Sequence, residues 1–313
     1  MFMFQSRTFP VLLAVLMFFL QTGNLQAKSV TDQIGRSFAV PDDPQRIIAL
    51  APSITEIIYD LHQEKRLVGV TQFSTYPSEA GKLPRVGSYV RLDIEKIVAL
   101  KPDLCLAIKD GNPKHIIDKI ISLGIPVYVI NPRNLPQVME TITNLGTLLH
   151  AEQAASELVT DMETRIDRVR SRITKAACTP RVFFQIDAEP LFSAGTNTYI
   201  HELIELAGGI NAAAGDISYP RYSWEDIIIL QPEIVLISSM AGGLAPDDLV
   251  RSWKKWPLLS AVENNLIFVV EADLFDRPTP RLVDGLEVIA PIIHPELFNE
   301  GGDKTRKDSC LLE

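Results

Sequence analysis

The chain is short of the residues from which most metal and disulfide sites are built. Its 313 residues include only 3 cysteines and 5 histidines, all far apart in the sequence. They are too few and too scattered for a disulfide framework, a C-x-x-C metal site or a paired-histidine site. Cys105 lies within an apolar run, where it reads as a small buried hydrophobic residue. The residues concerned are Cys105, Cys178, Cys310, His62, His115, His150, His201 and His294.

The sequence also lacks the short motifs that mark common catalytic and nucleotide sites. It has no phosphate-binding loop, no Gly-x-Gly-x-x-Gly and no nucleophile elbow. A bilobed enzyme or a metallocluster protein would need a nucleophile with its base, or converging cysteine or histidine ligands. We therefore expect a binding protein rather than an enzyme, without catalytic residues, a protein-bound metal or an intrinsic cofactor. The enzyme or metallocluster protein is kept as the alternative of another class.

Basic side chains are outnumbered, since 30 Lys and Arg stand against 39 Asp and Glu, a formal net charge of −9. There is no basic run, and none of the aromatic and basic patterns that stack on nucleic acid. This balance argues against nucleic acid or an anionic membrane surface as a partner. After residue 27 no apolar run is long enough to span a membrane, so we expect no direct membrane insertion.

Residues 1–27 read as a cleavable secretory signal. Arg7 precedes an apolar run at 11–20, and the segment ends in the small residue Ala27 before Lys28. An uncleaved anchor is the alternative, but a spanning helix needs roughly 20 apolar residues, and the run is about half as long. There is no cysteine at the cleavage point to which a lipid could be attached. We expect a mature protein free in the periplasm.

One short pattern occurs twice, 130 positions apart. Glu95 is followed by Leu100 and Pro102, and Glu225 is followed at the same offsets by Leu230 and Pro232. In each copy a capping residue, Asp93 or Ser223, opens a short helix, and the proline ends it before an apolar strand at 104–108 or 234–238. Two half-chains built on one plan predict two similar lobes with a binding cleft between them.

Strands alternate with helices in both halves, which predicts an α/β fold with parallel sheets covered on both faces. In residues 28–145 we expect strands at 46–50, 67–70, 104–108 and 126–130, with helices starting at 53, 93 and 115. Ser53 is the expected cap of the first helix, with Glu56 three residues on. In residues 176–299 we expect strands at 181–186, 234–238 and 266–270, and helices at 198–207, 223–230 and 280–294.

Residues 146–175 are expected to form one long helix that joins the two lobes. The stretch from 145 to 173 has no proline, its only glycine is Gly146, and apolar residues recur at steps of four and three. A helix of about 25 residues would extend roughly 37 Å, enough to run along both lobes. A helix packed within one lobe is the alternative. The polar segment at 300–313 is expected to fray.

Loops at the carboxyl ends of the predicted strands carry aromatic side chains. Such loops would suit a bulky, flat, partly apolar ligand, although each ring could instead cap the core of its lobe. Two arginines, Arg277 and Arg281, lie in a proline-rich loop, where they could clamp a ligand or pair with Asp276 or Asp284. The aromatic residues are Phe73, Tyr76, Tyr89, Phe192, Tyr219 and Tyr222.

Together these features resemble the substrate-binding proteins of ABC importers that serve cobalamin, ferric siderophores and heme. The resemblance covers residues 45–298 and is strongest to the cobalamin-binding members, through segments such as 68–71, 95–107, 192–195, 207–211 and 277–281. It implies two lobes joined by a single helix, a corrinoid bound in the interlobe cleft, and delivery to the transmembrane domains of an ABC importer. A ferric siderophore or heme is the alternative ligand, and a monomer is expected.

The resemblance also assigns site residues. By position, the family's corrin-contacting aromatics fall on Phe73, Tyr89, Phe192 and Tyr219. Tyr89 and Tyr219 replace tryptophans of the family, and Phe73 lacks the hydroxyl that the family's residue carries. Ile108 replaces a further aromatic, and an acid–arginine pair falls on Asp276 and Arg277. These differences leave room for another cobamide, a cobinamide, a siderophore or heme.

Glu95 and Glu225 match the family's acids that meet arginines on the transporter. A carboxylate in the first turn of a helix is also ordinary compensation of the helix dipole.

Overall fold

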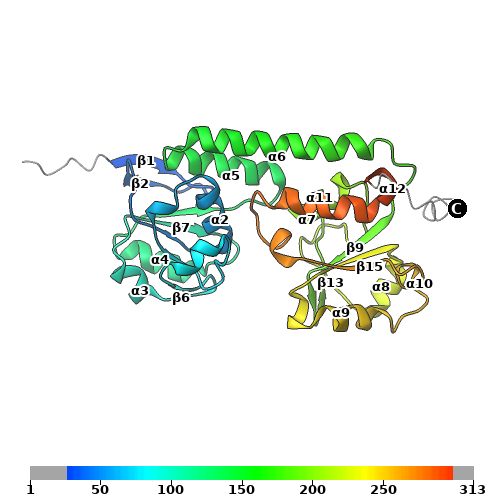
Figure 1. Ribbon diagram of the computed structural model, residues 1–313. Helices are drawn as coiled ribbons and strands as arrows, with labels where there is room; N and C mark the ends of the chain where they lie inside the picture. Colours follow the sequence, from blue (N-terminus) through cyan, green and yellow to red (C-terminus); the bar gives the residue numbers. More distant parts are fainter. Residues whose placement is uncertain (1–26, 299–313) are drawn as a thin grey trace, which may run out of the picture.

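The computed structural model describes residues 27–298. Figure 1 shows two α/β lobes side by side, with α6 (Glu152–Ile173) running along both of them. The predicted signal, apart from Ala27, and the predicted tail lie outside the described residues. Within them, no helix is both long and apolar enough to cross a membrane.

Each lobe is built on a four-stranded parallel sheet. The first sheet has the order β4 (Leu67–Val70), β3 (Ile47–Ala49), β7 (Leu104–Ile108) and β8 (Val127–Ile130). The second has the order β12 (Ile210–Asn211), β9 (Arg181–Gln185), β14 (Ile234–Ser238) and β15 (Ile267–Val270). In both, the first strand along the chain lies between the second and the third. The duplication predicted from the sequence therefore extends to the topology of the sheets.

Helices cover the sheets, as the alternating pattern predicts. The first lobe contains α2 (Pro52–Asp60), α3 (Ile94–Ala99), α4 (Lys114–Ser122) and α5 (Leu135–Leu148). The second contains α7 (Tyr199–Leu206), α8 (Trp224–Leu230), α9 (Pro246–Trp253), α10 (Ser260–Glu263), α11 (Leu282–Ile293) and α12 (Pro295–Phe298). Small antiparallel pieces complete the fold: β1 (Ala27–Thr31) with β2 (Ser37–Pro41), β5 (Gly87–Ser88) with β6 (Arg91–Leu92), and β10 (Asp187–Ala188), β11 (Leu191–Phe192) and β13 (Arg221–Tyr222).

Strand side chains alternate between two cores. In β7, Leu104 and Leu106 join a core that the two lobes share, whereas Cys105 and Ala107 belong to a core of the first lobe alone. Cys105 is fully buried, as expected, and burial raises the pKa of its thiol to about 12. The shared core continues through Met162, Ile166 and Val169 of α6. α6 packs against α5 of the first lobe and against α7, α11 and α12 of the second. One helix therefore holds the two lobes together.

The predicted single helix at 146–175 is wrong at its start. Residues 146–148 belong to α5, the chain turns back at 149–151, and α6 begins at Glu152. His150 takes a positive φ of 55° in this turn. Gly146 lets the two helices touch, because a Cβ there would lie 2.5 Å from the Cβ of Ala155. At 22 residues α6 is about 33 Å long, so a single long helix still joins the lobes.

The expected cap of α2 is also wrong. The helix begins at Pro52 with Ala51 as N-cap and no side-chain cap bond, and Ser53 lies buried within the first turn. Proline at the first helical position starts the helix without a capping hydroxyl. Glu56 is thereby free for another role.

Candidate functional site

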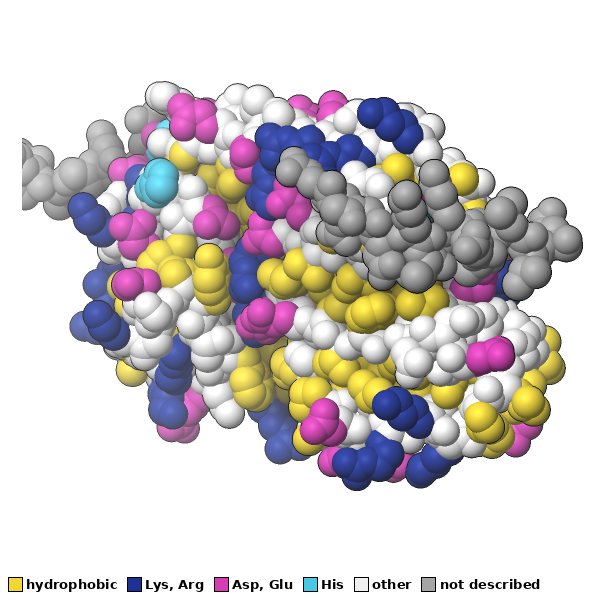
Figure 2. Space-filling model, turned by 45° about the vertical axis from the view of Figure 1, so that its right-hand side comes forward, with side chains coloured by type: hydrophobic (Ala, Val, Ile, Leu, Met, Phe, Trp, Pro, Cys, Tyr) yellow, Lys and Arg dark blue, Asp and Glu magenta, His cyan; other side chains and the backbone are white. Residues whose placement is uncertain are grey.

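Three of the predicted contact residues present large exposed aromatic surfaces. Phe73, Tyr89 and Tyr219 are 45%, 37% and 45% exposed, so these rings do not cap a core. Tyr76 is 43% exposed, whereas Tyr222 packs its ring edge-on against Phe183 at 5.5 Å and belongs to the core. Rings left open on both lobes provide apolar surface for a flat ligand. Figure 2 shows the surface hollowed between the lobes, with apolar and charged side chains along the furrow.

Tyr89 and Ile108 lie together in the first lobe. A Cβ added to Gly111 would lie 3.0 Å from the ring of Tyr89 and 3.4 Å from a methyl of Ile108. Asn112, only 6% exposed, holds this arrangement: its amide donates to the carbonyls of Tyr89 at 2.7 Å and Leu50 at 2.8 Å. Its Oδ1 accepts from the Ile108 N–H at 2.8 Å. Sequence reasoning missed Asn112, because nothing in its neighbourhood marks it as buried.

Tyr219 reaches across from the second lobe. Its hydroxyl interacts with that of the buried Tyr199. Although part of the residue is open to solvent, the surrounding protein desolvates the hydroxyl and raises its pKa, with Asp110 of the first lobe adding to the rise. Asp110 is paired with Arg133 at 2.9 Å. Tyr219 thus lies beside charged groups of the opposite lobe.

Phe192 is partly buried and already has one stacking partner. The Arg221 guanidinium lies 4.9 Å from the centre of its ring, and the two residues are register partners on β11 and β13. Cation–π contacts of this kind fix the ring and the arginine together. Phe192 therefore offers a ligand at most one face, and Arg221 lies next to it.

Asp276 and Arg277, the predicted ligand-contacting acid and arginine, have different partners in the structure. Arg277 pairs with Asp273 at 2.6 Å, one turn earlier in the chain. Asp276 accepts a hydrogen bond from Ser238 at 3.0 Å. Desolvation by the surrounding protein raises the pKa of Asp276 to about 6, although the residue keeps an exposed surface. Sequence reasoning offered Asp276 and Asp284 as alternative partners of the two arginines, whereas the short helical turn at 272–274 brings Asp273 to Arg277.

Arg277 also forms an ion pair between the lobes. Its guanidinium donates to Glu56 of α2 at 2.7 Å, and Arg281 approaches the other oxygen of Glu56 at 3.6 Å. Arg281 also lies over the ring of Tyr76, at 4.1 Å. We call Glu56, Asp273, Arg277 and Arg281 the interlobe cluster.

Sequence reasoning missed Asp273 and gave Glu56 only a capping role. The side chain of Glu56 is only 1% exposed, and its Oε2 has no hydrogen-bond partner among the described residues. Burial raises the pKa of Glu56, and the guanidinium groups of Arg277 and Arg281 only partly offset that rise. The same burial, with Glu56 nearby, raises the pKa of Asp60 on this helix to about 6. A buried carboxylate between two lobes had no local sequence signal, since both arginines lie over 200 positions away.

The cleft tyrosines and the repeated acids belong to one duplicated unit. Tyr89 precedes Glu95 by six positions, and Tyr219 precedes Glu225 by the same number. Both acids are exposed, and neither is needed as a cap: Asp93 accepts from the Lys96 N–H, and the Ser223 and Asp226 side chains form a capping box. In each lobe a short strand and a short helix therefore carry the tyrosine and the acid at the same interval.

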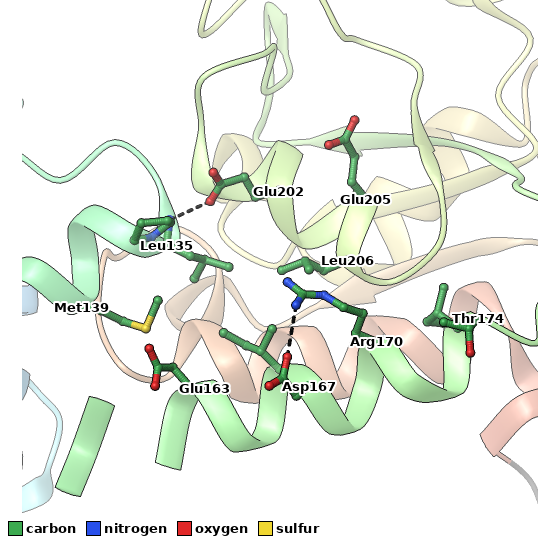
Figure 3. Close-up of a pocket in the computed structure, with 12 residues that line it drawn as sticks. Leu135, Met139, Glu163, Asp167, Arg170, Thr174, Glu202, Glu205 and Leu206 are labelled. Atoms are coloured by element: carbon green, nitrogen blue, oxygen red, sulfur yellow. Dashed lines mark hydrogen bonds and ion pairs between the residues drawn. The ribbon is translucent and has the colours of Figure 1, made fainter. Parts of the chain in front are cut away.

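A sizeable groove lies elsewhere. It encloses about 730 Å³ between α5, α6 and α7, and none of its described lining residues is aromatic (Figure 3). Glu202 crosses it to accept a hydrogen bond from the Leu135 N–H at 2.6 Å, and Asp167 pairs with Arg170 at 3.1 Å. Size alone does not make it the ligand site, because every aromatic contact residue predicted from the sequence lies outside its lining. Nor do the described residues contain a cluster of three or more His, Cys, Asp or Glu that could hold a metal ion.

Two lobes of common topology, one connecting helix and aromatic loops from both lobes define a two-lobed solute-binding protein. The sequence profile of the periplasmic binding protein family matches residues 47–274, and the chain belongs to this family. Its members are substrate-binding proteins, so this chain binds a solute and is not an enzyme. Membership also makes it an extracytoplasmic protein.

Similar proteins differ in their ligands. The vitamin B12-binding protein of Vibrio cholerae serotype O1 is 32% identical over 253 residues, covering 80% of this chain and 90% of the relative. The crystal structure of the periplasmic vitamin B12 binding protein of Vibrio cholerae has a TM-score of 0.69 at 30% identity, covering 80% of this chain and 96% of that one. A periplasmic heme-binding protein from Roseiflexus has a TM-score of 0.73 at 26% identity, covering 80% and 98%.

Proposed function

We propose that this protein captures a corrinoid, cobalamin or a close analogue, in the cleft between its lobes and delivers it to an inner-membrane ABC importer. The observation that carries the proposal is the set of open aromatic rings on both lobes, in a chain similar to vitamin B12-binding proteins. Heme or a ferric siderophore is the second candidate, favoured by the similarity to a heme-binding structure.

The cleft would hold its ligand by shape and stacking. Phe73, Tyr89 and Tyr219 supply flat apolar surface from both lobes, and Ile108 and Phe192 add to the two walls. Asp276 and Arg277 offer polar contacts at the base of the cleft, where Arg277 is already positioned by Asp273 and Glu56. No protein ligand to the metal of a corrinoid is required.

Delivery of the ligand to the importer would use the two repeated acids. Glu95 and Glu225 lie at equivalent places on α3 and α8, and both helices lie on the side of the molecule away from α6 (Figure 1). Two exposed acids at equivalent places on two similar lobes suit a transporter whose membrane domains form a two-fold dimer. Such charges would set orientation and association rate more than ligand affinity. A cleavable signal at residues 1–27 would direct the chain to the periplasm. The exported protein would act as a monomer.

Removing one stacking ring tests the cleft assignment. Tyr89→Ala and Tyr219→Ala are each expected to weaken cobalamin binding by about 1 kcal/mol, roughly fivefold, because each removes an exposed ring from the ligand surface. Isothermal titration measures the affinity, and the melting temperature of the free variant is the control for folding. Variants that melt early yet bind normally would place these rings in the core. Arg277→Ala is a poorer test, since it also breaks the interlobe cluster.

A further inference from the structure

Two arginines of the second lobe contact one aromatic loop of the first. Arg277 donates to the carbonyl of Phe73 at 3.5 Å, and the Arg281 guanidinium lies over the ring of Tyr76 at 4.1 Å. Both arginines also face Glu56 of α2, and Figure 1 shows α2 and the segment before α11 facing each other from the two lobes. The loop that carries Phe73 is therefore connected to the junction of the lobes.

Hydrogen bonds fix this loop to its own lobe. The hydroxyl of Ser74 lies 2.9 Å from the hydroxyls of Thr55 and Thr71, and all three residues are buried. Arg85 donates to the carbonyls of Thr71 and Ser74 at 2.7 Å and 2.8 Å. Because Thr55 belongs to α2, a contact made at Tyr76 acts on α2 and on the loop together.

The two arginines differ in the contacts that are left for them to make. Arg277 already forms ion pairs with Glu56 at 2.7 Å and with Asp273 at 2.6 Å. Arg281 lies farther from its carboxylates, at 3.6 Å from Glu56 and 3.8 Å from Glu271, although its side chain is only 15% exposed. Arg281 is therefore the arginine whose pairing can become stronger.

The atoms of Arg281 and Glu56 that face each other lack other partners. Nη1 of the arginine and Oε2 of the glutamate are both buried, and neither makes a hydrogen bond to any described residue. Leaving such atoms unpaired costs free energy, so a shorter distance between them would be stabilising. Because a hydrogen bond of this kind needs about 2.9 Å, the two atoms would have to approach by only about 0.7 Å.

A movement of this size suits two lobes that are held by one helix. α6 packs against helices of both lobes, so wide opening would break contacts that a sub-ångström approach would keep. Closure of two lobes around a ligand is a common response of binding proteins. A ligand stacked between rings of both lobes would draw α2 toward the segment that carries Arg281.

We propose that Arg281 is a positioning residue for ligand binding, which completes its bond to Glu56 when the lobes close on the ligand. Arg281 and Glu56 then form a latch. The completed bond favours the closed arrangement and slows release of the ligand, without contact between Arg281 and the ligand. The inference rests on the proposed function, in which the cleft between the lobes holds the ligand.

The rate at which the ligand leaves tests the latch. Arg281→Ala removes the latch but leaves Glu56 paired with Arg277, so the free protein should lose little stability. We expect cobalamin to dissociate about five to ten times faster from this variant than from the wild type, with an association rate within about twofold. Stopped-flow absorbance measures both rates, and urea unfolding measures the stability of the free variant.

Arg172 provides a matched control, because its guanidinium also lies over an aromatic ring, that of Phe298, at 5.1 Å. It belongs to the last turn of α6, and Arg172→Ala should release cobalamin at the wild-type rate. Glu56→Gln removes the charge from the other half of the latch. In that background Arg281→Ala should speed release by less than about twofold further, because two changes to one interaction are not additive. Arg281→Gln takes the place of the alanine variant if that variant does not fold.

The other outcomes are decisive. Release at the wild-type rate from a folded Arg281 variant would overturn the latch and leave the proposed function intact. A free variant that is destabilised as much as its ligand binding is weakened would make Arg281 a residue of the fold alone, and would also overturn the latch. Absence of corrinoid binding by the wild type would overturn the proposed function itself, and the same comparison of variants with heme as the ligand would then decide the latch.

Discussion

A chain carrying both Glu95→Ala and Glu225→Ala is expected to bind cobalamin normally and to lose most importer-dependent uptake. Both acids are exposed, and the caps of their helices are made by Asp93, Ser223 and Asp226, so their removal should not unfold α3 or α8. Charges at the rim of an interface mainly govern encounter and orientation. We expect association with the importer to fall at least about tenfold at low salt and to lose its salt sensitivity.

The matched control removes the same charge from another face. Glu152 and Glu157 are exposed on α6, on the side opposite α3 and α8, and their double replacement by alanine should leave uptake unchanged. Uptake by vesicles containing the importer is the measurement. Full uptake with Glu95 and Glu225 replaced would reduce these acids to compensation of the helix dipole. An equal loss with the control variant would point to total charge rather than to docking.

Glu56→Ala is expected to lower the free energy of unfolding by about 3 kcal/mol. Removing one member of a buried ionic group leaves its partners uncompensated, a change that costs about 3 to 5 kcal/mol. Because Arg277 keeps Asp273 as a partner, we expect a loss of stability at the lower end of this range. Arg281, whose side chain is 15% exposed, keeps the ring of Tyr76 and a long contact with Glu271, at 3.8 Å. Urea unfolding of the ligand-free protein measures the loss.

Glu56→Gln separates the shape of this residue from its charge. Because burial raises the folded-state pKa of Glu56 above its ordinary value of 4.5, the wild type gains stability at low pH and loses it as the pH rises through the folded pKa. A neutral glutamine removes the charge but keeps an acceptor for Arg277, and we expect it to cost about 1 kcal/mol less than alanine and to reduce that pH dependence. Equal losses for alanine and glutamine at neutral pH would contradict this account.

The sequence predicted the features that depend on local chemistry. Asp93 and Ser223 cap their helices as expected, and Pro102 and Pro232 stand before the strands that they were predicted to precede. Such features are set by a few neighbouring residues, and the duplication doubled each signal. The exposure of Tyr89, and its place beside Ile108, likewise follow from loops at the carboxyl ends of strands.

Features that depend on distant contacts were not predictable in this way. The turn at His150 contains neither proline nor glycine, and it forms because α5 packs back on α6 through Gly146. Glu56 has the spacing of a capping residue, yet it pairs with Arg277 across the cleft. Asp273, which sequence reasoning did not name, pairs with the same arginine one helical turn earlier in the chain. Each of these outcomes is decided by packing between segments far apart in the chain.

Titration of the free protein with a panel of ligands tests the central claim most directly. Cobalamin, cobinamide, heme and a ferric siderophore are each titrated into purified protein, with heat and absorbance recorded together. We expect saturable binding of cobalamin or cobinamide at one ligand per chain, with weaker binding of the other two. No heat with either corrinoid, alongside saturable binding of heme or the siderophore, would contradict the account and make the protein a carrier of that ligand instead.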